Sequence, residues 1–222
     1  MDQIVFLTEI LLPALVGGTI LTLELIAVTA PVGILLGIAI AVGRTYGSRT
    51  IVEICKGFVI FFKGCPLLLL LFILYFGFPT IGITFSAFTA AVIGFICCNS
   101  AYNSEYIRGA ILSVQQGQLI AAKALGMTKR QTIINIVLPQ ALRRAIPGIS
   151  NEFIYLIKYS SLAYVITVIE LTGSAKQVAT KYFMYTETFI IVALFYLAIV
   201  TVATIGINAI EKRVAIPGFV RK

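Results

Sequence analysis

Long apolar runs separated by short polar segments make up most of the chain. A helix needs about 20 mostly apolar residues to cross a bilayer, and five runs offer about that length. We therefore expect an all-α integral membrane protein with about five transmembrane helices, forming a single domain over residues 1–222. The predicted spans lie at about residues 16–42, 57–77, 85–104, 148–169 and 189–210.

Glycine and proline interrupt one of these runs. The stretch of residues 64–104 carries no charge and is too long for one helix at a rise of 1.5 Å per residue. A turn is predicted in its middle, at residues 77–82, so that two spans flank a tight hairpin. The first of these spans is expected to break at Gly64 and Pro66, which weaken or remove backbone hydrogen bonds inside the membrane and need protein neighbours.

The segment of residues 108–146 is mixed and basic, and we predict that it forms an extramembrane loop. Residues 118–125 are typical of a short helix, and Gly126 is predicted to end it. Thr128 and Gln131 are spaced as a capping box that opens a second helix.

Two prolines set the expected limits of the helices that follow. The second loop helix is predicted to run to Pro139. The fourth span is predicted to begin after Pro147, because proline is favoured in the first turn of a helix. The loop is thus expected to hold a helix, a sharp turn and a second helix close to the membrane.

Composition supports this picture and excludes several classes of function. The chain is 59% hydrophobic and 12% charged, with a mean hydropathy of +1.02, outside the range of soluble globular domains. It contains no histidine, no Gly-x4-Gly-Lys-Ser/Thr phosphate loop and no nucleophile paired with a base. We therefore expect a protein that is not an enzyme.

The distribution of basic residues predicts the topology. The 17 Lys and Arg residues lie between apolar runs rather than on one face, so the net charge of +8 does not indicate a nucleic-acid partner. Most of them flank span ends that share one side of the membrane, whereas Lys176 and Lys181 lie on the other side. The positive-inside rule then places the N-terminus outside and the long loop and C-terminus in the cytoplasm. The loop carries Arg108, Lys123, Lys129, Arg130, Arg143 and Arg144.

Small residues within the spans are interpreted as packing residues. Gly33 and Gly37 are spaced to allow close approach of another helix. The four cysteines lie in or beside apolar stretches without paired metal-ligand spacing, and we expect no metal site. They are Cys55, Cys65, Cys97 and Cys98.

The loop also carries a spaced motif. Ile120-Ala121-Ala122 is followed after three residues by Gly126, then after nine residues by Ile136, and then by Leu138-Pro139. This pattern resembles the cytoplasmic EAA loop of the inner-membrane permeases of ATP-binding-cassette (ABC) importers, in which Glu-Ala-Ala, Gly, Ile and Leu-Pro stand at the same spacing. Six of the seven positions match.

Further segments resemble the branch of this family that takes up polar amino acids. They are Gly117-Gln118 before the motif, Pro-Gln-Ala-Leu-Arg at 139–143, Lys63-Gly64-Cys65-Pro66, Ala101-Tyr102 with Glu105 and Arg108-Gly109, and Asn151 with Lys158 and Ser160-Ser161-Leu162. Three positions depart from the family pattern. Ile120 replaces the first Glu of the loop motif, Lys63 replaces an Arg, and Tyr159 replaces an Asp that bears on which substrate is accepted.

The resemblance implies a function. It implies the permease subunit of an ABC importer that translocates polar amino acids across the cytoplasmic (inner) membrane of a prokaryote. The implied partners are two ATPase subunits, a second permease copy or a homologous permease, and an extracytoplasmic amino-acid-binding protein. No cofactor is expected on this chain, since ATP and Mg would bind the partner ATPase. The implied ATPase-coupling residues are Gly117, Gln118, Ile120, Ala121, Ala122, Gly126, Ile136, Leu138 and Pro139.

Ionisable and hydroxyl groups inside spans are candidates for a substrate path. A charge at the centre of a span costs about 2.5 to 3.5 kcal/mol on insertion scales, so such groups usually face a cavity or a partner. The candidates are Lys158, Glu152, Tyr159, Ser160, Ser161 and Glu24. Alternatives remain open: a structural ion pair for Lys158, an interfacial position for Glu152, and hydrogen bonds to neighbouring backbone for the hydroxyls.

A second class of function is a secondary transporter or channel driven by an ion gradient. It would need no ATPase. No internal inverted halves, which that class often has, are apparent in the sequence. This alternative would also leave the loop motif unexplained.

Overall fold

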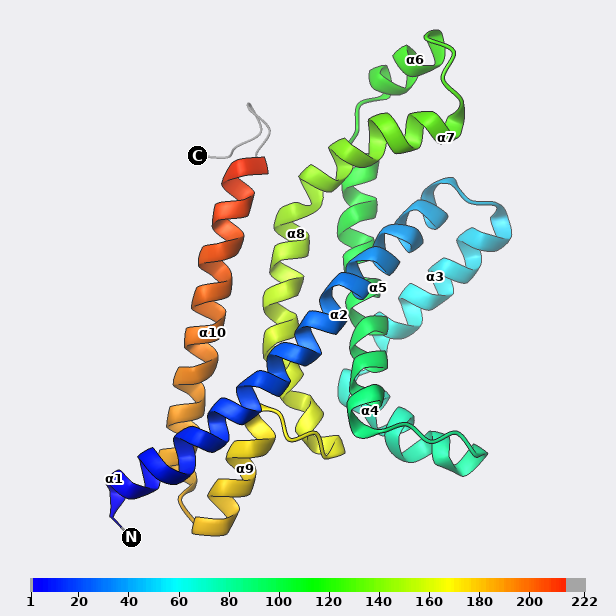
Figure 1. Ribbon diagram of the computed structural model, residues 1–222. Helices are drawn as coiled ribbons and strands as arrows, with labels where there is room; N and C mark the ends of the chain where they lie inside the picture. Colours follow the sequence, from blue (N-terminus) through cyan, green and yellow to red (C-terminus); the bar gives the residue numbers. More distant parts are fainter. Residues whose placement is uncertain (1, 215–222) are drawn as a thin grey trace.

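A computed structural model describes residues 2–214, and every regular element in that range is helical. The helices form an elongated bundle, with the N-terminal segment near one end and α6 and α7 projecting at the other (Figure 1). The α-helices are α1 (Gln3–Val5), α2 (Leu12–Tyr46), α3 (Arg49–Gly64), α4 (Leu67–Phe72), α5 (Ala87–Leu112), α6 (Gln116–Ala124), α7 (Lys129–Thr132), α8 (Leu138–Tyr159), α9 (Leu171–Tyr182) and α10 (Tyr185–Val214). Short π- or 3-10-helical segments lie at Phe6–Leu11, Ile73–Gly77, Phe78–Ile81, Ile133–Val137 and Ser160–Ile166.

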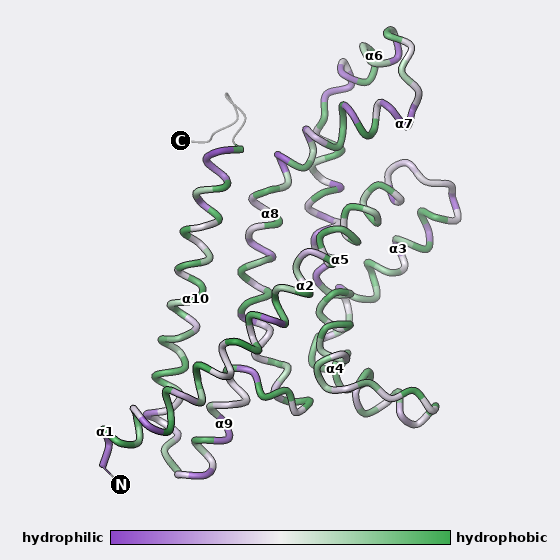
Figure 2. Tube along the Cα trace, in the orientation of Figure 1, coloured by the Kyte–Doolittle hydropathy of each residue, from purple (hydrophilic) through white to green (hydrophobic). Residues whose placement is uncertain are grey.

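The predicted all-α membrane fold is confirmed, whereas the count of five spans stays a prediction. Within residues 2–214, the segments Gln3–Tyr46 and Tyr185–Val214 are each long and apolar enough to cross a bilayer. The count rises to as many as four if each of two bent helix pairs is one span. Only 6% of the most apolar window of α10 is buried within the chain, which leaves its apolar side chains free to face lipid (Figure 2).

Helix α5 is not among these candidates, although residues 85–104 were predicted to span. Its second half is polar, and this polar half lies inside the bundle. A helix enclosed by other helices does not need a uniformly apolar surface, because its polar groups find partners within the protein. The buried polar residues of α5 are Asn99, Ser100, Asn103 and Ser104.

The glycine pair of α2 forms the surface against which α5 packs. A Cβ added to Gly33 would lie 2.2 Å from Oδ1 of Asn99, and one added to Gly37 would lie 2.9 Å from Cβ of Asn103. Any larger residue would push the two helices apart. The predicted use of these glycines for close helix approach is therefore confirmed.

The predicted second span, residues 57–77, is not one straight helix. Helix α3 ends at Gly64, the chain turns at Cys65 and Pro66, and the following helical segment is bent from α3 by 102°. The interruption predicted at Gly64 and Pro66 is present. It divides the segment into two helices with different directions.

Two predictions about the prolines after the loop were wrong. A continuous helix runs from α7 through the π-helix Ile133–Val137 into α8, so it neither ends at Pro139 nor begins at Pro147, which lies inside α8. In the π turn the amide of Leu138 donates to the carbonyl of Ile133, five residues back. This change from i−4 to i−5 hydrogen bonding comes directly before Pro139, which has no amide proton to donate. It allows the helix to continue past the proline.

The predicted fourth span, residues 148–169, changes from α-helix to 3-10 helix after Tyr159. Helix α8 ends there, Ser160–Ile166 form a 3-10 helix, and Thr167 adopts a left-handed φ of 70°. Helix α9 then follows at an angle of 49°. The apolar pattern did not predict α9, because this helix is amphipathic and too short to span.

Glu170 joins α9 to its neighbours. Its side chain is 0% exposed and caps α9 by accepting hydrogen bonds from the amides of Thr172 (3.0 Å) and Gly173 (2.9 Å). The hydroxyl of Tyr196 in α10 donates to the same carboxylate at 2.9 Å, and that of Thr22 in α2 does so at 3.4 Å. Three helices are therefore held together by one buried carboxylate, which the sequence reading did not single out.

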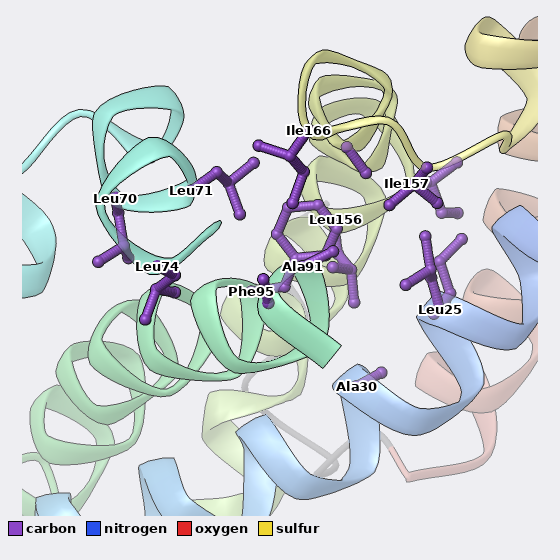
Figure 3. Packing of buried hydrophobic residues seen from close by; sticks show 14 residues of the cluster. Leu25, Ala30, Leu70, Leu71, Leu74, Ala91, Phe95, Leu156, Ile157 and Ile166 are labelled. Atoms are coloured by element: carbon purple, nitrogen blue, oxygen red, sulfur yellow. The ribbon is translucent and has the colours of Figure 1, made fainter. Parts of the chain in front are cut away.

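The largest buried apolar cluster joins α2, α4, α5 and α8 (Figure 3). Side chains from the four helices interdigitate there, and the cluster fixes the bend after α3 against α5 and α8. Its members include Leu25, Ala30, Leu70, Leu71, Leu74, Ala91, Phe95, Leu156, Ile157 and Ile166.

The C-terminal end, with Arg221 and Lys222, was predicted to lie in the cytoplasm, and it is outside the described residues. The described part of α10 ends at Val214, at the same end of the bundle as α6 and α7 (Figure 1).

Replacing Gly18 by Val is expected to destabilise the fold, whereas the same change at Gly17 is not. A Cβ at Gly18 would lie 2.6 Å from Oγ of Ser174 and 2.9 Å from the carbonyl oxygen of Glu170, while one at Gly17 meets nothing within 4 Å. We expect a loss of about 1–3 kcal/mol for Gly18→Val, as for overpacked cores. Denaturant titration of the purified protein in lipid discs measures this loss of stability. Equal stability of the two variants would contradict the α2–α9 packing.

Candidate functional site

The loop motif forms a compact helical projection. Helix α6 ends in a Schellman motif, in which the amide of Met127 donates to the carbonyl of Ala122 (3.1 Å) and that of Gly126 to the carbonyl of Lys123 (3.0 Å). Gly126 has a φ of +76°, a conformation that strains residues with a Cβ. The predicted stop at Gly126 is confirmed.

The predicted capping box is also present. The amide of Gln131 donates to Oγ1 of Thr128 at 3.3 Å, and the amide of Thr128 donates to Oε1 of Gln131 at 2.8 Å. Helix α6 begins at Gln116, slightly before the predicted start. The loop thus has the predicted order of a helix, a sharp turn and a second helix, held by local hydrogen bonds.

The motif residues divide between two faces. Ala122 is 2% exposed and packs inward. Ile136 and Leu138 are partly buried in the helix that leads into α8. The remaining motif residues are exposed: Gly117, Gln118, Ile120, Ala121, Gly126 and Pro139. Most of the motif is therefore available to a partner.

Polar contacts fasten the loop to the long helices. Nζ of Lys129 donates to the carbonyl of Tyr46, at the end of α2, at 3.0 Å. The guanidinium of Arg144 in α8 donates to the carbonyl and, at 3.0 Å, to the hydroxyl of Ser113, just after α5. Displacement of the loop would therefore be transmitted to α2 and α5.

Helices α2 and α5 are joined to each other near the same end. An ion pair connects Arg44 of α2 with Glu105 of α5, and both side chains are partly buried. A partly buried, hydrogen-bonded ion pair is screened less by salt than a surface pair. Helices α2 and α5, which both accept hydrogen bonds from the loop region, are thus also joined to each other by an ion pair.

A cavity of about 560 Å³ lies where the chain bends after α3, between that bend, α5 and α8. It brings together residues from three separated parts of the sequence. Its lining is formed by Lys63, Gly64, Cys65, Pro66, Leu67, Cys98, Tyr102, Tyr106, Glu152, Tyr155, Tyr159 and Leu162. The family-like segment at 63–66 and two of the predicted path residues, Glu152 and Tyr159, therefore share one cavity.

Glu152 is the acidic group of this cavity. It is 3% exposed, and its Oε1 accepts from the hydroxyl of Tyr159 at 3.3 Å and from Nδ2 of Asn99 at 3.4 Å. Oδ1 of Asn99 in turn accepts from Nδ2 of Asn103 at 2.8 Å. These bonds are long at the carboxylate, so Glu152 keeps acceptor capacity for an ammonium group.

The other predicted path residues do not line the cavity. Lys158 is exposed, and its Nζ lies 5.0 Å from the ring centroid of Tyr155. Glu24 is exposed on α2. The hydroxyls of Ser160 and Ser161 donate to backbone carbonyls of the preceding turn, at 2.8 and 2.7 Å, which is the alternative left open above.

Sequence reasoning missed several lining residues that helical spacing could have found. Cys98, Tyr102 and Tyr106 recur every four residues and share one face of α5. Glu152, Tyr155 and Tyr159 share one face of α8 by the same rule. A search for polar and aromatic residues at this spacing in neighbouring spans would have identified the cavity face.

Comparison with known proteins gives the family. Residues 33–216 match the model of the binding-protein-dependent transport system inner membrane component. The chain belongs to this family. It is 42% identical to "Probable amino-acid ABC transporter permease protein YckA" of Bacillus subtilis (strain 168) over 203 residues, which cover 91% of this chain and 90% of the relative. It is 39% identical to "L-cystine transport system permease protein TcyB" of the same strain, over 76% of this chain and 72% of that protein.

Solved structures agree with this family assignment. The structure described as "Crystal structure of an amino acid ABC transporter with histidines" superposes with a TM-score of 0.87 at 30% identity, covering 96% of this chain and 99% of that one. An inward-facing structure of the MetNI methionine ABC transporter has a TM-score of 0.77 at 18% identity and covers 97% and 100%. The latter likeness shows the shared fold alone. Within the family the ATPase is a separate protein, and the chain is an inner-membrane component.

Gly126→Ala is expected to loosen the turn of the loop. The substituted residue would carry a Cβ at positive φ, which costs about 1–2 kcal/mol, although nothing lies within 4 Å of the added atom. Hydrogen exchange at the amides of Gly126 and Met127 should quicken roughly tenfold, since 1.4 kcal/mol corresponds to a factor of ten. Gly109→Ala is the matched control, because a Cβ there also meets nothing. Unchanged exchange in Gly126→Ala would contradict the assigned turn.

Proposed function

We propose that the chain is the permease subunit of an ABC importer that translocates polar amino acids across the cytoplasmic membrane of a prokaryote. ATP would be hydrolysed, with Mg, in a separate ATPase subunit. The observation that carries this proposal is the EAA-like motif folded into an exposed helical projection that is hydrogen-bonded to α2 and α5. The names of the relatives, which are amino-acid permeases, support the substrate class.

The mechanism follows from these contacts. A partner that grips α6 and moves on binding or hydrolysing ATP would pull on Tyr46 through Lys129 and on Ser113 through Arg144. Helix α5 carries this motion to the cavity, because its polar half lines the cavity and packs on α2. The chain itself would perform no chemistry, and the work would come from the partner's nucleotide.

The cavity is suited to a zwitterion. The carboxylate of Glu152 supplies an acceptor for an α-ammonium group, and Lys63 at the cavity edge supplies a donor for an α-carboxylate. Nζ of Lys63 lies 5.4 Å from the ring centroid of Tyr102, so it is already directed toward α5. The tyrosine hydroxyls and aromatic faces would contact the remainder of the substrate.

The proposed orientation places the projection in the cytoplasm and the N-terminus outside. The turn between α2 and α3, helices α6 and α7, and the end of α10 gather at one end of the bundle (Figure 1). These segments carry seven basic residues, which supports the positive-inside assignment: Arg44, Arg49, Lys123, Lys129, Arg130, Lys212 and Arg213. The proposed assembly adds two ATPase subunits, a second permease copy or a homologous permease, and an external amino-acid-binding protein.

ATPase stimulation by substrate-loaded binding protein tests the proposal. The permease and its candidate ATPase are assembled in lipid discs, and the native chain is compared with Gly126→Pro, which forbids the φ of +76°. We expect stimulation in the native assembly and at least a tenfold loss of it in the variant, with the spans still folded. Failure of the native permease to associate with any ATPase, together with uptake driven by an ion gradient, would favour a secondary transporter instead.

Glu152→Gln is expected to reduce uptake at least tenfold, because it removes the only acidic group among the described residues of the cavity lining while keeping the shape of the side chain. Glu24→Gln makes the same chemical change at an exposed position outside the lining and serves as the control. Both are measured as initial uptake rates in proteoliposomes at matched protein content. Equal rates for the two variants would remove Glu152 from the path.

A further inference from the structure

The cavity lining carries one positive and one negative side chain among its described residues, Lys63 and Glu152. Neither belongs to the ion pairs found within residues 2–214, so both charges are available to a ligand. The α-ammonium and α-carboxylate groups of a zwitterion need one partner of each charge. Binding these two groups therefore uses both charges of the lining.

The rest of the described lining is uncharged. It offers two thiols, four phenol rings and the apolar side chains of leucine and proline: Cys65, Pro66, Leu67, Cys98, Tyr102, Tyr106, Tyr155, Tyr159 and Leu162, with Gly64. Aromatic faces and sulfur atoms make favourable contacts with neutral, polarisable groups. A second positive charge on the ligand would find no further carboxylate there, and it would lose its hydration when the cavity closes around the ligand.

The aromatic rings do not compensate for a cationic side chain. Nζ of Lys63 lies 5.4 Å from the ring centroid of Tyr102, and Nζ of Lys158, which is outside the lining, lies 5.0 Å from that of Tyr155. Ring faces attract cations, and two of the four rings already have an ammonium group of the chain itself over them. These two ammonium groups would repel a further positive charge brought into the cavity.

Tyr159 keeps the α8 wall of the cavity at a single negative charge. Its hydroxyl donates to Oε1 of Glu152 at 3.3 Å and accepts from Nδ2 of Asn99 at 3.4 Å. Its ring packs edge-on against Phe95, with the centroids 5.5 Å apart. Tyr159 thus occupies a position beside Glu152, on the same face of α8, where an acidic residue would place a second carboxylate.

We propose that the cavity accepts amino acids whose side chain carries no positive charge and rejects cationic ones, and that Tyr159 sets this selectivity by leaving Glu152 as the single carboxylate of the described lining. The inference rests on the proposed function, in which the cavity holds the transported amino acid, and it narrows the substrate class. One carboxylate can neutralise an α-ammonium group or a cationic side chain, but not both. Lysine or arginine would therefore bring an unpaired positive charge into the cavity, which disfavours them relative to neutral amino acids.

Protection of Cys65 from alkylation measures occupation of the cavity. Cys65 lines the cavity and is partly exposed, whereas Cys55 in α3 is also partly exposed and is not part of the described lining. The nucleotide-free importer is assembled from the permease and its ATPase in lipid discs and treated with a maleimide, and the modified peptides are quantified by mass spectrometry. A bound amino acid should slow the reaction at Cys65 and leave that at Cys55 unchanged.

Two pairs of amino acids of matched shape isolate the effect of charge. Methionine and lysine have unbranched side chains of similar length, and citrulline has a urea group where arginine has a guanidinium. In the native importer, the concentration that halves the alkylation rate of Cys65 should be about tenfold or more lower for the neutral member of each pair, because the unpaired charge of the other member is desolvated.

Two substitutions of Tyr159 test its role in selectivity. Tyr159→Asp adds a carboxylate beside Glu152 and should lower the preference for methionine over lysine by about tenfold or more. Tyr159→Asn is the matched control, because asparagine has the size of aspartate without its charge, and its preference should stay within about threefold of native. Each preference is a ratio measured within one protein, so differences in the amount of folded variant cancel.

The possible failures of this inference and of the proposed function differ. Equal protection of Cys65 by lysine and methionine in the native importer would overturn the inference and leave the proposed importer in place. An unchanged preference in Tyr159→Asp would overturn the role given to Tyr159. Protection of Cys65 by none of the four amino acids, or equal protection of Cys55, would contradict the proposed substrate site itself.

Discussion

Helix α5 packs tightly against α2, and this contact positions both the loop and the cavity. A bilayer offers no hydrogen bonds, so the polar half of α5 is stable only where other helices enclose it. Gly33 and Gly37 allow that enclosure by bringing α2 within contact of Asn99 and Asn103. The Arg44–Glu105 ion pair then joins the two helices near the loop. With α5 fixed in this way, its polar residues can face inward without exposing unpaired groups to lipid.

The same helix links the loop to the cavity. At its C-terminal end, Ser113 accepts a hydrogen bond from Arg144 of α8. Its middle contributes Cys98, Tyr102 and Tyr106 to the cavity lining. Glu152 approaches it from α8 and is bound by Asn99. A rigid helix with one end at the loop and its middle at the cavity would provide a direct mechanical path between the proposed ATPase partner and the proposed substrate site.

Features that depend on neighbouring residues were predicted from the sequence, whereas features that depend on contacts between distant helices were not. The Gly126 turn and the Thr128–Gln131 capping box depend on neighbouring residues only, and both were predicted correctly. The continuation of the helix past Pro139 was missed because a π turn offsets the lost hydrogen bond. Glu170 was missed because its partners come from α2 and α10. Spacing alone places Cys98, Tyr102 and Tyr106 on one face of α5, but the meeting of that face with α8 and with the bend after α3 is a tertiary effect.

The energy source of transport distinguishes an ABC importer from a secondary transporter. Proteoliposomes containing the permease, its ATPase and substrate-loaded binding protein are supplied either with hydrolysable ATP on the ATPase side or with an ion gradient and a non-hydrolysable ATP analogue. We expect accumulation of the amino acid with ATP alone and none with the gradient. Accumulation that follows the ion gradient while ATP hydrolysis is blocked would contradict it.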